Sequence, residues 1–185
     1  MNKKLFLTVI FSVCLIAGAF AQDAFQKGDK VINLGVGLHS WLTINHADAS
    51  FPPIGASLDY SLISGLLDDH AAIGVGGYVG FASSKWHYSE DLGYNLIDMV
   101  FGARGTFHYQ FVDRLDTYGG VLIGYDVVSK NNFGNGAIVD NTNSKSSAVY
   151  GTFIGGRFYF TENIAVYAEL GYGIAALELG LSYKF

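Results

Sequence analysis

The side chains able to do chemistry are scattered singly along this sequence, in stretches that are otherwise apolar or rich in glycine. The acids and arginines that stand out in this way are Asp59, Asp98, Arg104, Asp126, Arg157, Glu169 and Glu178. Brought together, such groups could form salt bridges, supply a carboxylate pair for acid–base catalysis, or line a polar pore. The histidines and acids show no metal-ligand spacing. The sequence therefore predicts no metal site and no cofactor.

The elements that must position these groups are strands, because apolar residues recur at every second position. In the closing stretch "ALELGLSYKF", the alternate residues are large and apolar: Leu177, Leu179, Leu181, Tyr183 and Phe185. The same alternation predicts eight strands, over residues 30–41, 53–63, 71–82, 97–110, 117–128, 147–160, 164–173 and 176–185.

The two faces of these strands decide between a soluble β-sandwich and a membrane barrel. The polar face carries glycine, small residues and isolated charges, in place of the crowded Lys, Glu and Thr of a solvated sheet. The apolar face carries bulky aromatics near both strand ends. After residue 21 no apolar run approaches the roughly 18 residues of a spanning helix. The predicted fold is all-β, an eight-stranded antiparallel up-and-down transmembrane β-barrel with apolar side chains facing lipid and charges facing the lumen.

The start of the chain has the pattern of a secretory signal peptide. Lys3 and Lys4 precede an apolar run at 5–16, and Ala19-Phe20-Ala21 has the small-x-small form of a cleavage site. The single cysteine, Cys14, lies in this run, so the mature protein is predicted to contain no disulfide. The predicted divisions are a signal peptide at 1–21, a short periplasmic segment at 22–29 and the barrel at 30–185.

The mature chain is acidic. All 16 acids lie after residue 21, but two of the 11 bases lie before it, so the net charge from residue 22 onward is 9 − 16 = −7. A strongly negative chain repels the phosphate backbone. We therefore expect no nucleic-acid partner.

Three stretches of the chain resemble a known group of proteins: "GARGTFHYQFVDRLDTYGGVLIGYDVVS" (102–129), "GGRFYFTENIAVYAELGYG" (155–173) and the ending "LGLSYKF". The chain after residue 21 resembles the small eight-stranded bacterial outer-membrane β-barrels, the outer-membrane β-barrel domain family that includes the OmpA- and OmpX-like barrels. This resemblance implies a Gram-negative outer membrane, with lipid and lipopolysaccharide around the barrel. It also implies that the outer-membrane insertion machinery recognises the C-terminal residues Leu179, Leu181, Tyr183 and Phe185.

The connections between the predicted strands alternate in length. The short ones lie at 64–70, 111–116 and 161–163, with a tight turn at 174–175, and the long polar ones lie at 42–52, 83–96 and 129–146. Long loops of such barrels are extracellular, so they are the candidate surface for an extracellular ligand that the sequence leaves unidentified. The candidate contact residues are Trp86, His87, Tyr88 and Phe133, of which Trp86 and Tyr88 would also suit an interfacial aromatic belt.

The turn positions also predict which lumen charges meet. If the 161–163 turn sets the register, Glu169 lies opposite Gly155, one diagonal step from Arg157. Across the last hairpin, Glu169 and Glu178 become diagonal neighbours. Their repulsion would require either a bridging arginine or a proton on one carboxylate.

The turn at 111–116 makes a similar prediction for the fourth and fifth strands. It places Asp126 opposite Gly102, on a diagonal from Arg104. Tyr118 is the exception in this region, since it falls on the polar face of its strand. The remaining ionisable residues predicted to face the lumen are His39, His108 and Lys184.

The lumen charges admit three uses: a salt-bridged plug, a narrow pore or catalysis. Because an eight-stranded interior is largely filled by side chains, the plug is favoured. His39-Ser40 and His46-Ala47-Asp48 raise the alternative of an outer-membrane lipid-modifying enzyme, but His39 would face the lumen while Ser40 faces lipid. The prediction is a non-enzymatic protein with a structural or surface-interaction, adhesion-like role. Its alternatives are a narrow porin-like channel for small solutes and a lipid-modifying enzyme.

Overall fold

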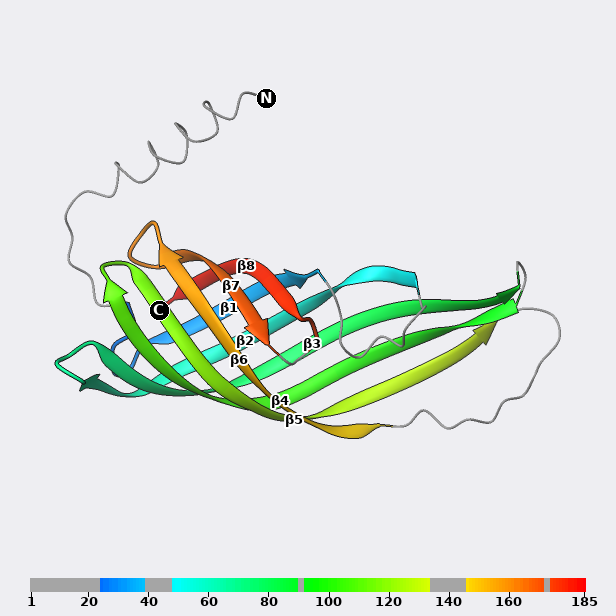
Figure 1. Cartoon of the computed structure of the whole chain (residues 1–185), viewed down its shortest axis with the longest axis horizontal. Coiled ribbons are helices and arrows are strands. Elements are labelled where there is room, and N and C mark those ends of the chain that lie inside the picture. Colours follow the sequence, from blue (N-terminus) through cyan, green and yellow to red (C-terminus); the bar gives the residue numbers. More distant parts are fainter. Residues whose placement is uncertain (1–23, 39–47, 90–91, 134–145, 172–173) are drawn as a thin grey trace, which may run out of the picture.

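The chain is a closed barrel of eight antiparallel strands (Figure 1). The computed structural model describes residues 24–38, 48–89, 92–133, 146–171 and 174–185. Each strand pairs with its sequence neighbours, and the first pairs with the last, which confirms the predicted fold class. The strands are β1 (Lys30–Gly37), β2 (Asp48–Leu66), β3 (Ala71–Ser89), β4 (Leu92–Val112), β5 (Leu115–Phe133), β6 (Ser147–Tyr159), β7 (Ile164–Gly171) and β8 (Leu177–Lys184).

Some sequence predictions concern residues outside the described ranges. The signal peptide at 1–21 is one of them, and the orientations of His39 and Ser40 are another. These remain predictions. Within the described residues, no helix is long and apolar enough to cross a membrane.

The strands differ greatly in length, which the alternation did not predict. β2 to β5 span 19 to 21 residues, whereas β1, β7 and β8 span eight residues each. The prediction of a loop over 83–96 is wrong, because β3 and β4 stay paired as far as Ser89 and Leu92. Backbone hydrogen bonds between strands continue into water, where neither face has to be apolar. Alternation therefore stops before the strands do.

A band of exposed apolar side chains surrounds the barrel. On β3 the band extends from Ile73 to Phe81, which at ~3.3 Å per residue and a tilt of about 45° spans roughly 20 Å of membrane. Its upper edge is a row of paired residues from four successive strands: Ile54, Phe81, Met99 and Val127. Beyond this row the outward positions are mixed on β2 and β4, where Phe51 and Ile97 are apolar. On β3 and β5 they turn polar, at Ser83, Lys85, Ser129 and Asn131. This apolar band is the lipid-facing surface of a transmembrane barrel.

The short turns lie at the end of the barrel where β1 begins and β8 ends, here called the turn end. β4 ends at Val112 and β5 begins at Leu115, so Asp113 and Arg114 alone form their turn. Arg114, the second residue of this turn, has φ 65°, which lies in the left-handed region that some tight turns require at this position. The predicted connection at 111–116 is thus too long. The pairing of β4 with β5 also has an irregularity between Tyr109 and Val112, which shifts the register of the lumen charges. The opposite end, where β2 to β5 extend past the other strands, is called the extended end.

Candidate functional site

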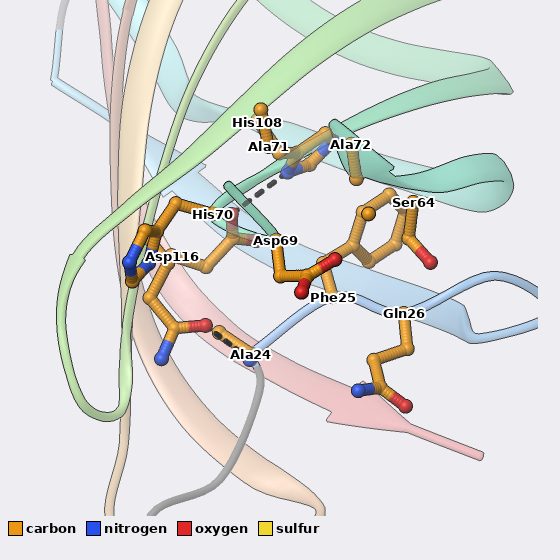
Figure 2. A pocket seen from close by; sticks show the side chains of 12 residues that line it. Ala24, Phe25, Gln26, Ser64, Asp69, His70, Ala71, Ala72, His108 and Asp116 are labelled. Carbon is orange, nitrogen blue, oxygen red and sulfur yellow. Dashed lines mark hydrogen bonds and ion pairs between the residues drawn. The ribbon is translucent and has the colours of Figure 1, made fainter. Parts of the chain in front are cut away.

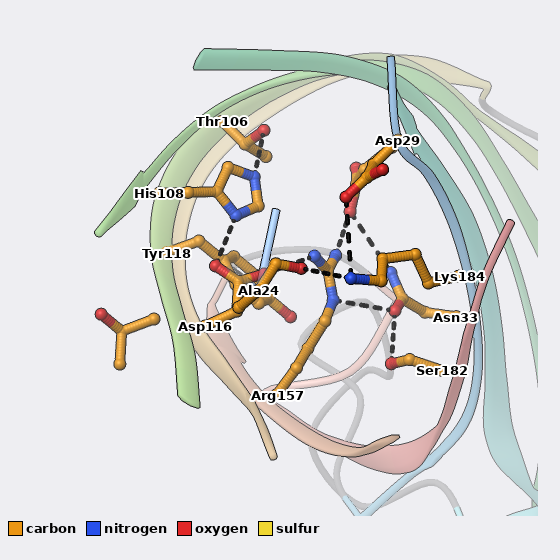
Figure 3. A network of polar contacts seen from close by, with 12 residues as sticks. Ala24, Asp29, Asn33, Thr106, His108, Asp116, Tyr118, Arg157, Ser182 and Lys184 are labelled. Atoms are coloured by element: carbon orange, nitrogen blue, oxygen red, sulfur yellow. Dashed lines mark hydrogen bonds and ion pairs between the residues drawn. The ribbon is translucent and has the colours of Figure 1, made fainter. Parts of the chain in front are cut away.

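Arg157 of β6 lies in the middle of the lumen and is completely buried. Its Nη1 donates to Asp116 Oδ2 at 2.9 Å, and its Nε donates to Asn33 Oδ1 at 3.1 Å (Figure 3). Its Nη2 forms a charged hydrogen bond with Asp59 Oδ2. These partners belong to β5, β1 and β2, so one planar guanidinium, which donates in several directions at once, ties four strands together.

Arg104 of β4 forms a second cationic centre beside the first. Its Nε lies 3.0 Å from Asp59 Oδ1, and its Nη2 lies 2.8 Å from Glu169 Oε2. The Tyr118 hydroxyl donates to the same Glu169 oxygen at 3.1 Å. The guanidinium carbon is 4.1 Å from the centre of the Phe153 ring, which adds a cation–π contact. Asp59 therefore bridges the two arginines.

Glu178 of β8 is held by hydroxyl groups instead of cations. Tyr167 donates to its Oε1, and Tyr78 donates to its Oε2 at 3.2 Å. Gly35 and Gly55 lie against this side chain, and a Cβ atom at either glycine would collide with it. The two glycines thus make room for a carboxylate that is 7% exposed.

The register of the last hairpin brings two carboxylates closer than the sequence predicted. Glu169 and Glu178 are direct partners, not diagonal ones. The expectation of a tight turn at 174–175 is wrong, because β7 ends at Gly171 and β8 begins at Leu177. The longer connection moves the register by two residues.

Of the predicted lumen contacts, one is confirmed and two are wrong. Glu169 lies opposite Gly155 as predicted, but its cationic partner is Arg104, which reaches it across the lumen from β4. Asp126 lies opposite Val100, not Gly102, and the strand pairing has an irregularity between Tyr109 and Val112 that shifts its register. Arg104 therefore does not pair with Asp126. Asp98 and Asp126 lie on the inner face nearer the extended end, and each is 4% exposed.

Asp116 and Tyr118 are central to the network, and the sequence analysis missed both roles. Asp116 was assigned to a turn, and Tyr118 was read as an exception to the alternation. The signal for both was present, because Asp116, Tyr118 and Leu122 have the same parity on β5 and all point inward. Tyr118 faces the lumen, where its hydroxyl finds a polar partner. An aromatic side chain therefore does not by itself indicate the lipid face of a strand.

His108 joins this network to Thr106. Its Nδ1 is 2.8 Å from Asp116 Oδ1, and its Nε2 is 2.8 Å from Thr106 Oγ1. The order hydroxyl–imidazole–carboxylate is that of a catalytic triad. Here, however, Thr106 is 4% exposed and His108 is 2% exposed, and Asp116 also binds Arg157. The geometry is that of a buried structural chain of hydrogen bonds.

Toward the extended end, the lumen is filled by an apolar cluster. Its buried members include Tyr78, Val100, Leu122, Phe153 and Ile174. Ile174, from the connection between β7 and β8, has no exposed surface. The cavity between this cluster and the charged residues is about 10 Å³, the space of a single water molecule at most. Among the described residues, packed side chains thus occupy the lumen from its charged middle to this cluster.

At the turn end a larger pocket of about 330 Å³ opens beside the charged network (Figure 2). Ser64, Asp69, His70 and Gln110 contribute polar groups to it, and Phe25 and Ala72 contribute apolar surface. His108 and Asp116 form part of its wall. Another part of its wall comes from the segment before β1: Ala24, Phe25 and Gln26.

The candidate contact residues lie on the extended strands. Trp86 pairs with Tyr94, and His87 pairs with Gly93, on β3 and β4. Phe133 is the last residue of β5 and pairs with the same Gly93. Tyr88 lies in β3 as well. These residues belong to a paired sheet and not to a long loop.

The closed register, the outward apolar band and the inward charges define an eight-stranded up-and-down transmembrane β-barrel with a packed interior. No protein-family model matches the sequence, and no curated protein matches it. Among solved structures, the attachment invasion locus protein Ail of Yersinia pestis is similar, with a TM-score of 0.50 and 14% sequence identity over 86% of this chain and 100% of that chain. OprG, an outer membrane protein of Pseudomonas aeruginosa, has a TM-score of 0.54 and 11% identity over 88% of this chain and 98% of that chain. The resemblance to small outer-membrane barrels is thus confirmed at the level of the fold.

Proposed function

We propose that this chain is an outer-membrane protein whose barrel is a closed anchor, and that its role is contact at the cell surface through the sheet raised by β2 to β5. Lipid and lipopolysaccharide surround the apolar band. Export depends on a signal peptide cleaved after Ala21. The insertion machinery recognises the C-terminal stripe, whose members are 45–58% exposed on the outer face: Leu179, Leu181, Tyr183 and Phe185.

The observation that carries this proposal is the unequal length of the strands. β3 and β4 remain paired from Ala71 and Tyr109 to Ser89 and Leu92, whereas β7 and β8 are paired only from Ile164 to Leu170. On β3 the apolar band ends at Phe81, and the next outward residues are Ser83, Lys85 and His87, so the rest of this strand stands in water. A structural anchor alone does not require strands that continue about eight residues, or ~26 Å, past the lipid.

The raised sheet has the composition of a contact surface. Its outward positions are polar, as at Lys85, His87 and Asn131. On its inner side Lys130 Nζ lies 4.4 Å from the centre of the Tyr94 ring. Aromatic and amide side chains of this kind are enriched where proteins recognise partners. The sheet is paired and therefore presents these residues on a rigid support, which lowers the entropy cost of binding.

The test shortens the β3–β4 hairpin while leaving the barrel intact. Ser84 and Leu96 are paired, so residues 85–95 can be replaced by an Asn-Gly turn, which favours a two-residue hairpin. Cells displaying the protein are tested for adhesion to surfaces coated with collagen, fibronectin, laminin or purified lipopolysaccharide. We expect adhesion to at least one surface for the natural chain and its loss on shortening. Glu162→Ala, in the turn at the opposite end, is the control and should bind normally.

Two outcomes would contradict the proposal. One is equal adhesion by the shortened and natural chains, and the other is no adhesion by the natural chain to any of these surfaces. A steady single-channel conductance in planar bilayers would favour the narrow channel instead. We expect no such conductance, because the apolar cluster around Ile174 is packed. The expectation that the chain is not an enzyme is tested by incubating it with radiolabelled lipid A or phospholipid. Turnover that disappears in Ser40→Ala would support the lipid-modifying alternative.

A further inference from the structure

The segment before β1, residues 24–29, crosses the turn end of the lumen and is here called the strap. Its backbone is hydrogen-bonded to residues of β2 and β4. Ala24 N donates to Gln110 Oε1 of β4 at 2.7 Å, and Lys27 N donates to Ser64 Oγ of β2 at 3.0 Å. Gly28 N and Asp29 O both bond to the Ser61 backbone at 3.0 Å. These bonds hold the strap across the mouth (Figure 2).

Two apolar side chains of the strap point into the barrel. The Phe25 ring stacks on His108, with 4.0 Å between the ring centres and an angle of 27°, and only 6% of Phe25 is exposed. The same ring lies 5.9 Å from the Arg157 guanidinium carbon. Ala24 is 2% exposed and packs with Tyr159 and Ala165. The strap therefore covers the charged network from the turn end.

The strap also contacts the seam where the first and last strands meet. Lys184 of β8 places its Nζ 3.5 Å from Ala24 O and 3.7 Å from Asp29 Oδ2 (Figure 3). Next to it, Lys30 and Phe185 exchange two backbone hydrogen bonds, at 3.1 and 2.9 Å. The strap's binding surface is thus assembled from β2, β4, β6, β7 and β8 together. It does not exist until the barrel is closed.

We propose that the strap is a built-in closure of the periplasmic mouth, which docks only on the closed barrel and keeps water away from the buried charges. Because ion pairs are stronger where water is excluded, this closure strengthens the contacts of Arg157 and Asp116. The pocket of about 330 Å³, which reaches the edge of the network at His108 and Asp116, is then the limit of solvent entry from this end. This inference does not depend on the proposed surface contact, since it concerns the opposite end of the barrel.

A single introduced cysteine tests the closure. Ser61 lies directly under the strap, has no exposed surface, and its Oγ has no hydrogen-bond partner among the described residues. Ser61→Cys changes one atom, and Cys14→Ser makes it the only thiol of the full chain. Purified protein in detergent is treated with a charged methanethiosulfonate, and the labelling rate is measured. We expect slow labelling with the natural strap and at least tenfold faster labelling in Phe25→Ala.

A second variant loosens the strap without removing any packing. Gly28 has φ +95°, which a residue with a Cβ adopts only under strain, and no atom lies within 4 Å of the position of that Cβ. Gly28→Ala should therefore also raise the labelling rate of Ser61→Cys. The matched controls are Phe111→Ala, a lipid-facing aromatic that is 70% exposed, and Gly77→Ala, whose Cβ has room on the outer face. Neither control should change the rate.

The outcomes separate opening of the strap from loss of the fold. Ala82→Cys, under the apolar cluster, reports on the rest of the barrel and should stay unreactive in every strap variant. Circular dichroism gives the β-sheet content. If Ala82→Cys becomes reactive in Phe25→Ala, that variant has unfolded. The labelling rate of Ser61→Cys in Gly28→Ala then decides whether the strap is a closure. Folded strap variants that label no faster than the natural strap would overturn the proposal, as would fast labelling of Ser61→Cys with the natural strap in place.

Discussion

Glu169 of β7 and Glu178 of β8 are direct partners across the last strand pair, yet their carboxylates bind different groups. Glu169 forms an ion pair with Arg104, and Glu178 accepts hydrogen bonds from Tyr78 and Tyr167. Two acids at one register position are tolerable only if each has its own donors, because like charges directly opposite destabilise a sheet. The stability of the barrel therefore depends on which cations and hydroxyls remain in the lumen.

Replacing Arg157 with Ala should lower the free energy of unfolding by about 3–5 kcal/mol, because it leaves Asp59 and Asp116 buried without that cation. Arg157→Lys should lie between the natural chain and Arg157→Ala, since an ammonium cannot reproduce the fork of donors. Denaturant unfolding in detergent micelles measures both. Lys85→Ala, an exposed charge on the raised sheet, is the control. An unchanged free energy of unfolding for Arg157→Ala would show that this arginine does not organise the lumen.

Replacing Arg104 with Met should destabilise the barrel, because the change exposes Glu169 to its direct neighbour Glu178. Adding Glu169→Gln removes the negative charge of Glu169, which then no longer repels Glu178. It should restore part of the lost unfolding free energy, of the order of 1–3 kcal/mol for a coupled pair. A double-mutant cycle of unfolding free energies measures the coupling. If the two changes simply add, the pair seen across the lumen does not contribute to stability.

Replacing Gly55 with Ala should cost about 1–3 kcal/mol, because the new Cβ meets the Glu178 carboxylate. Gly77→Ala is the matched control, since its Cβ has no atom nearer than 3.9 Å. Removing the obstructing side chain with Glu178→Ala should reduce the cost of Gly55→Ala. Thermal unfolding of the four variants checks this, and equal destabilisation by the two alanine substitutions at glycine would contradict the assignment.

Replacing Phe185 with Ser should reduce the amount of protein in the outer membrane severalfold while leaving refolding in detergent unchanged. The ring is 53% exposed on the outer face, so the folded barrel has little packing to lose. Phe111→Ser, at another exposed lipid-facing position, is the control for loss of an aromatic. Quantitative blots of membrane fractions, compared with refolding yields, make the test. Equal loss for both variants would indicate a general folding defect and not recognition of the C-terminus.

The alternation of the sequence predicted the eight strands and the inward side of Asp59, Arg104 and Arg157, because in a strand the face follows from parity alone. These three residues are each 4% exposed or less. Their partners could not be predicted in the same way. Asp59 contacts both arginines from a strand that is next to neither, and the identity of neighbours across the lumen depends on how the sheet closes.

The ends of the strands explain the remaining errors in the site. The sequence predicts Asp126 beside Arg104, but an irregularity in the pairing between Tyr109 and Val112, next to the two-residue turn, shifts the register. The sequence also predicts a loop where β3 and β4 extend, because strands in water keep their hydrogen bonds without keeping an apolar face. Apolar alternation indicates which residues contact lipid. It does not indicate where strands remain paired outside the lipid.

By itself, the sequence determined an inside-out barrel, since the period of two and the small polar inner face are local properties of each strand. Only the tertiary structure decided that Asp59 joins two arginines, that the β2–β5 sheet rises above the others, and that Phe25 covers His108. Those contacts join residues far apart in the chain. Their formation depends on turn lengths and on closure of β1 against β8, which no stretch of sequence specifies alone.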